Sequence, residues 1–122
     1  MNKIICNSVD FVFRHEIITM IQGEAPVLTD TAGWKKIDVS EKPVYQSIIK
    51  RNDAGATNEE TVTAKERRKT LYATFMHCYY IILRMSTNSE TFYVGNLDYP
   101  CEVEISSDKI FDNYTFKAVS PA

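Results

Sequence analysis

The chain has 122 residues, of which 44% are hydrophobic and 25% are charged, and its formal net charge is −2. This length and composition fit one globular domain, so we expect a single domain over residues 1–122. The near-neutral charge removes the general attraction on which bulk binding of nucleic acid or anionic membranes depends, although it leaves room for a local patch. The sequence shows no secretory leader core and no apolar run near the ~20 residues of a spanning helix. We therefore expect a cytoplasmic protein that does not enter a membrane.

The N-terminal third predicts strands separated by a long loop. Residues 16–22 fit either an extension of the first strand or a short helix, and we leave both open. Glycine, proline and small polar residues then predict a loop up to residue 33, before a short strand at 34–39. Period-two alternation predicts the first strand, because three apolar side chains fall on one face of it: Val9, Phe11 and Phe13.

The middle of the chain predicts strands on either side of a polar segment. Residues 44–50 are rich in β-branched and aromatic side chains, which favours a strand. Residues 51–60 are small and polar around a glycine, so we predict an exposed and mobile loop there. Residues 61–65 resume an extended strand with Val62 and Ala64 pointing inward.

One short helix is predicted in the second half, among further strands. Apolar side chains spaced four apart between residues 71 and 76 favour an amphipathic helix. Residues 79–95 predict a β-hairpin whose first strand is buried on both faces. Residues 101–105 alternate between apolar side chains and glutamates, and residues 114–119 form the last strand. The chain is therefore predicted to be mainly β, an antiparallel β-sandwich or partly open barrel of about seven strands with one short α-helix across an end.

The reactive side chains do not form a recognisable catalytic or metal-binding pattern. Cys6, Cys78 and Cys101 are too scattered for a disulfide framework or a zinc motif, so we expect reduced, mostly buried thiols. His77 directly precedes Cys78, and neighbours in sequence do not face each other on a helix or a strand. His15 is the remaining base that a thiol could use. We predict no catalytic residue, no metal site and no cofactor.

Exposed charges and tyrosines mark a candidate interaction surface. The basic run at 65–69 lies near an aromatic residue, which would suit contact with single-stranded nucleic acid. The glutamates at 59, 60 and 66 dilute this field, so a solvated strand end or helix start is the favoured interpretation. Tyrosine clusters around the hairpin suit a protein contact, because tyrosine combines a large rigid ring with a polar tip. The candidate surface comprises Arg51, Asp53, Lys65, Arg67, Arg68, Tyr80, Tyr93 and Tyr99.

The order of motifs over residues 44–122 resembles that of small structural proteins encoded by phages and prophages, particularly tail or head–tail connector components. The resemblance implies a β-sandwich subunit that joins copies of itself or other virion proteins in a ring or tube, without catalytic residues or a small-molecule substrate. It would place the chain in the host cytoplasm or in a virion. The motifs are DAG at 53–55, ETVTA at 60–64, YIILR at 80–84, YVGN at 93–96 with YPC at 99–101, and YTFKA at 114–118.

Two other classes of function remain open from the sequence. The first is a small β-sheet binding module for a peptide, a carbohydrate or a nucleic acid. The second is an enzyme, which would need His15, His77 or Cys78 to converge in a preorganised pocket. The mass of the protein over a concentration series would separate an assembly subunit from a binding module.

Overall fold

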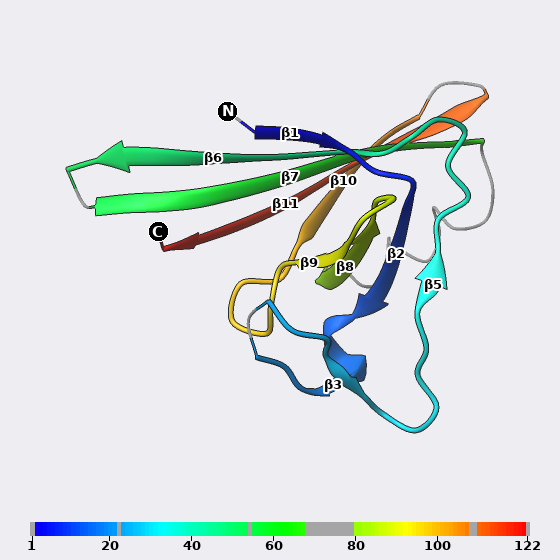
Figure 1. The fold of residues 1–122 in the computed structure, drawn as a ribbon, viewed down its shortest axis with the longest axis horizontal. Helices are drawn as coiled ribbons and strands as arrows, with labels where there is room; N and C mark the ends of the chain where they lie inside the picture. Colours follow the sequence, from blue (N-terminus) through cyan, green and yellow to red (C-terminus); the bar gives the residue numbers. More distant parts are fainter. Residues whose placement is uncertain (1, 22, 54, 68–79, 108–109, 122) are drawn as a thin grey trace.

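The computed structural model describes residues 2–21, 23–53, 55–67, 80–107 and 110–121. Within them the chain is mainly antiparallel β-structure in two main sheets, so the predicted sandwich class is confirmed (Figure 1). The described strands do not close into a barrel. The helix predicted at 71–76 lies outside the described residues.

The larger sheet, sheet A, has five strands in the order β1-β6-β7-β11-β10. Its neighbouring strands are all antiparallel. Two long strands, β7 and β11, lie side by side in its centre, with β6 next to β7 (Figure 1). Its members are β1 (Asn2–Ile5), β6 (Val44–Asn52), β7 (Gly55–Arg67), β10 (Glu102–Ser107) and β11 (Phe111–Pro121).

The smaller sheet, sheet B, has four strands in the order β5-β2-β8-β9. A 3-10 turn, η1 (Arg14–Glu16), follows β2 of this sheet and leads into a separate two-stranded hairpin of β3 and β4. Of the described residues in the segment left open at 16–22, Glu16 ends the 3-10 turn and Ile17–Thr19 are extended as β3. The strands are β2 (Ser8–Phe13), β3 (Ile17–Thr19), β4 (Val27–Leu28), β5 (Lys35–Lys36), β8 (Ile81–Ser86) and β9 (Thr91–Val94).

The main core lies between the facing sides of sheets A and B. Sheet B contributes the inward face of β2, as the alternation predicted, together with alternate residues of β8 and β9. A smaller apolar cluster on the other face of sheet B contains Val12, Ile17 and Ile82. Strand β8 is therefore buried on both faces, which confirms the prediction for the first strand of the hairpin. The fully buried residues of the main cluster include Val9, Phe11, Ile37, Val62, Leu83, Met85, Val94 and Phe116.

Two predicted elements are wrong in extent. The strand expected at 34–39 is limited to β5, and Val39 forms only an isolated bridge with Glu66. The loop expected at 51–60 is instead the tip of a hairpin, because β6 continues to Asn52 and β7 begins at Gly55. Gly55 has a φ of 128°, a conformation that side-chain-bearing residues rarely adopt, so it suits the tight turn.

Sheet A narrows from five described strands to three over two neighbouring rows. Within the described residues, β1 pairs with residues 44–47 of β6, and β10 pairs with residues 112–117 of β11. Ser47 lies opposite Glu60 and Lys117 lies opposite Thr61, so the two outer strands end within one residue row of each other. Beyond this level three strands continue together, which Figure 1 shows on the left. We call this extension the wing: residues 48–52, 55–60 and 118–121.

Candidate interaction surface

Polar cross-strand pairs hold the wing together. Glu59 in its central strand receives Lys50 Nζ at 3.0 Å from one side and Lys117 Nζ at 3.2 Å from the other. These bonds lower the pKa of Glu59 below its usual range. At the base of the wing, the Tyr45 hydroxyl donates to Glu60 Oε2 at 2.7 Å. Side chains that suggested a loop are therefore satisfied by partners on β6 and β11, while the backbone of β7 is paired on both sides.

Both edges of the wing are open within the described part of the chain. No described strand pairs with residues 48–52 of β6 on the side away from β7, or with residues 118–121 of β11 on its outer side. Ile49 is 63% exposed and Val119 is 44% exposed, so an apolar side chain sits near each edge. Unpaired backbone groups on an edge strand are a template for pairing with another chain.

A groove of about 320 Å³ runs beside the open edge of β11. Its lining includes Tyr80, Tyr99 and Pro100 together with Lys117 and Val119 of β11. Both tyrosine rings are well exposed, at 50% and 41%. The groove therefore combines exposed aromatic area with a strand edge that can accept backbone hydrogen bonds.

The groove carries negative charge beside the β11 edge. Asp98 and Glu102 also line it, and both are exposed. At the opposite edge of the wing, Lys50 and Arg51 are exposed on β6. Lys117 also lines the groove, and Asp53 lies at the turn beside Arg51, so the groove keeps a net negative charge and the β6 edge a net positive charge.

The structure brings together only some of the eight predicted surface residues. Tyr80 and Tyr99 share the groove, and Arg51 and Asp53 share the tip of the wing. The others lie elsewhere or outside the described residues. Lys65 and Arg67 are at the end of β7 away from the wing, where Lys65 Nζ lies 4.5 Å from the centre of the Phe111 ring. Tyr93 packs against Trp34. Arg68 lies outside the described residues.

Tyr93 belongs to a cluster on the outer face of sheet B. Arg84 bonds Asp10 Oδ2 through Nε at 3.2 Å and through its terminal nitrogen at 2.9 Å. The guanidinium also lies 4.7 Å from the centre of the Trp34 ring. Trp34 in turn contacts Tyr93 with ring centres 5.9 Å apart. The Arg84–Asp10 ion pair and the ring contacts make this cluster a support for sheet B.

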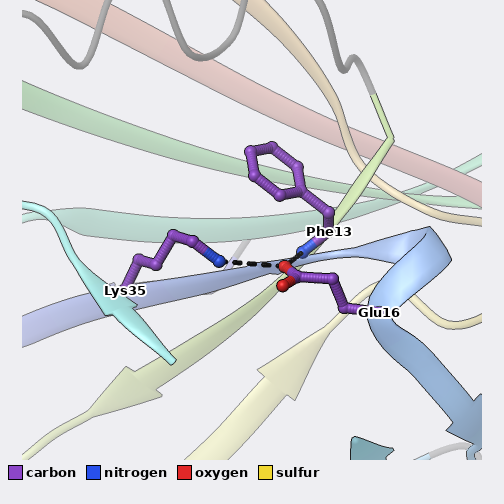
Figure 2. Close-up of polar contacts among 3 residues, drawn as sticks. All are labelled: Phe13, Glu16 and Lys35. Carbon is purple, nitrogen blue, oxygen red and sulfur yellow. Dashed lines mark hydrogen bonds and ion pairs between the residues drawn. The ribbon is translucent and has the colours of Figure 1, made fainter. Parts of the chain in front are cut away.

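A second charged contact joins β5 to the turn after β2, as Figure 2 shows. Lys35 Nζ lies 2.9 Å from Glu16 Oε1, which also accepts the Phe13 backbone N–H at 3.1 Å. The ammonium group lies 5.0 Å from the centre of the Phe13 ring. Burial alone would raise the pKa of Glu16, but the two hydrogen bonds and the nearby positive charge lower it. This contact fixes the entry into η1.

A buried carboxylate pair, which the sequence analysis missed, lies at the end of sheet A away from the wing. Glu66 and Asp112 are cross-strand neighbours on β7 and β11, and each is almost fully buried. Glu66 accepts the Tyr114 hydroxyl and the Asp38 backbone N–H, both at 3.1 Å. Asp112 Oδ1 accepts the Ser107 hydroxyl, whereas Oδ2 is buried without a described partner. The pair takes no part in the wing or the groove.

The described thiols and imidazole do not converge. Cys6 and Cys101 are buried and free, as predicted, and burial raises the pKa of each thiol. His15 is exposed and stacks on Phe13. The His77–Cys78 pair lies outside the described residues. Among the residues that the structure does describe, no group of three or more metal-ligating side chains comes together.

The sequence analysis identified the two tyrosines of the groove but missed the edges beside them. Lys50, Asp98, Glu102 and Val119 were not singled out, because their importance depends on where β1 and β10 stop. No signal in the local sequence marks that level. It follows from the pairing of strands far apart in the chain.

Comparison with protein-family models, with curated proteins and with solved structures finds no match to this chain. Of the helical segments in the described part of the chain, none has the length and apolar character needed to cross a membrane.

Proposed function

We propose that this protein is a non-catalytic assembly subunit that self-associates through the wing of its β-sandwich. The observation that supports the proposal is the narrowing of sheet A, which leaves two open strand edges side by side among the described residues. An open edge gains backbone hydrogen bonds when another strand pairs with it. Resemblance to phage and prophage structural proteins supports a place in a virion, as a tail or connector component.

Two features make the wing suitable for reversible association. Ion pairs across its strands keep it ordered without a covering layer. Its exposed apolar side chains, Ile49 and Val119, lose water-accessible area only when a partner arrives. A contact between folded subunits therefore needs no unfolding of the sandwich.

Mass measurement by light scattering over a concentration series tests self-association. We expect the mean mass to rise above that of a 14.0 kDa monomer as concentration increases. A shortened variant that lacks residues 50, 51, 56 and 57 removes two paired rows but keeps the turn and the alternation of the hairpin. We expect it to fold and to associate at least about tenfold more weakly. A mass that stays monomeric for the intact chain, or that is unchanged by the shortening, would contradict the proposal.

Virion membership is tested separately by the neighbouring genes. Genes for capsid, portal or tail proteins on either side would support it. Neighbours that encode only metabolic enzymes would count against it, while leaving self-association to the mass measurement.

The groove favours a second candidate function, a small β-sheet module that binds a peptide. Tyr80 and Tyr99 offer aromatic contact area beside a free strand edge. The carboxylates of Asp98 and Glu102 disfavour the phosphates of a nucleic acid. Under this alternative the protein stays monomeric at high concentration and binds extended basic peptides.

A further inference from the structure

We propose that the tip of one wing docks beside β11 of a second copy, so that β6 of the first copy pairs antiparallel with β11 of the second. This inference rests on the proposed function and names its partner surfaces. The docking site is the notch: the open edge at residues 118–121 together with the groove-lining residues Tyr80, Tyr99 and Pro100. The inserted element is the open edge at residues 48–52.

The direction of pairing follows from what surrounds the notch. Strand β10 occupies the line beside β11 from Lys117 backward along the sheet. A neighbouring β6 that ran parallel to β11 would have to pass through that line before reaching residues 118–121, because β6 is continuous from residue 44. An antiparallel β6 instead enters from beyond the end of β11, and the turn after its residue 52 then points toward the start of β10. Only the antiparallel arrangement avoids a collision.

The lengths of the two edges agree. Four residues of β11 are open, which corresponds to about 14 Å of strand. Five residues of β6 are open after Ser47, the last residue that pairs with β1. When the inserted turn lies beside the start of β10, the β1 strand of the inserted copy begins just beyond the end of β11. Each copy then supplies the strand that the other lacks.

Charge favours this pairing over a symmetric one. The inserted tip brings Lys50 and Arg51 toward Asp98 and Glu102 of the notch, where these two carboxylates outnumber the single ammonium group of Lys117. Two β6 edges paired with each other would instead bring lysine and arginine side chains together, and like charges opposite one another destabilise a strand pair. Pro121 has no N–H to donate, so any strand that pairs with the β11 edge, β6 included, relies on the other residues of that edge for backbone donors.

Because the two edges differ, the contact is heterologous and can repeat from copy to copy. Each subunit carries one tip and one notch, so addition of one copy leaves a free tip at one end and a free notch at the other. Such contacts produce open filaments, or closed rings if the rotation between copies closes. This matches the extended assemblies that the proposed function requires.

Charge reversal tests the pairing with two double variants. Lys50→Glu/Arg51→Glu makes the tip acidic, and Asp98→Lys/Glu102→Lys makes the notch basic. Each variant alone places like charges in the contact, so we expect its dissociation constant for self-association to rise at least about tenfold. In an equal mixture the acidic tip meets the basic notch and the unchanged basic tip meets the unchanged acidic notch. We therefore expect association to return to near the wild-type level.

Matched controls separate this contact from effects of net charge or folding. Lys36→Glu/Lys42→Glu makes the same change in charge at exposed lysines outside the wing and should leave association unchanged. Circular dichroism should show that each variant keeps its β-structure. If the wild type associates but the reversals do not weaken it, or the mixture does not restore it, the pairing is wrong while self-association stands. A wild type that stays monomeric overturns both.

Discussion

Replacement of Tyr45 probes the joint between the wing and the body. Its hydroxyl donates to Glu60 Oε2 at 2.7 Å, and its ring meets that of Phe92 in sheet B edge-on, with centres 5.0 Å apart. Tyr45→Phe keeps the ring contact and removes only the bond to the carboxylate. A hydrogen bond to a charged group contributes about 1.5–3 kcal/mol when buried. Because both side chains are only half-buried and Glu60 can rehydrate, we expect a loss of about 1 kcal/mol.

Tyr45→Ala should cost more, because it also removes the ring from the interface between the sheets. The aromatic pair contributes about 0.5–1.5 kcal/mol beyond burial. Loss of a half-buried ring adds to this, so we expect about 3 kcal/mol in total. Urea unfolding with linear extrapolation measures both differences.

A double-mutant cycle with Glu60→Gln isolates the hydrogen bond. We expect a coupling energy of about 1 kcal/mol between positions 45 and 60. Burial, followed by the bond to Glu60, raises the pKa of Tyr45 above its usual value near 10. The stabilisation is therefore fully present below pH 10 and is lost as pH rises beyond it. If the losses of unfolding free energy in the two single variants add to that of the double variant within about 0.3 kcal/mol, the role assigned to this hydrogen bond is refuted.

Two further predictions concern the body of the sandwich. Gly95 has a φ of 87°, and a Cβ there would lie 3.1 Å from Cys101 Sγ and 3.2 Å from the Cys101 backbone nitrogen. We therefore expect Gly95→Ala to lower the free energy of unfolding by more than about 1 kcal/mol. Gly33→Ala meets open space without a positive φ and should be neutral or slightly stabilising, and equal melting temperatures for the two variants would contradict this reasoning. Glu16→Gln weakens the contact with Lys35 and should cost about 1 kcal/mol at pH 7. Because folding lowers the pKa of Glu16, the stabilisation by its carboxylate is present above the usual glutamate pKa and is lost as pH falls through the pKa of the folded state. A difference in unfolding free energy between Glu16→Gln and wild type that persists unchanged at pH 3 would argue against this ion pair.

The strands of the sandwich core could be predicted because apolar side chains recur at every second residue of a strand with one buried face. Val9, Phe11 and Phe13 project into the main core as a strand of that spacing requires. Ile82 lies in the second cluster while Ile81 and Leu83 lie in the first, which is why this strand is apolar on both faces. Such patterns lie within a few consecutive residues, so they can be recognised in the sequence without knowledge of the fold.

The wing could not be predicted from local pattern because its strand signals are nonlocal. Residues 55–60 have no buried apolar face of their own. They become a strand because β6 and β11 pair with them on both sides and supply Lys50, Lys117 and Tyr45 as partners for their acidic side chains. All three partners come from strands that the sequence did predict, but the register between those strands could not be derived from the sequence. The same lack of register hid the level at which β1 and β10 stop.

The charges of the wing explain how an open edge can be kept without indiscriminate pairing. Lysine and arginine on an exposed edge strand discourage pairing with another edge of the same kind. Lys50 and Arg51 occupy the β6 edge, so two such edges repel each other. Asp98 and Glu102 beside β11 reverse this effect for one edge only. The same side chains that protect a free subunit from random sheet extension would therefore select the one partner edge on which an ordered assembly can grow.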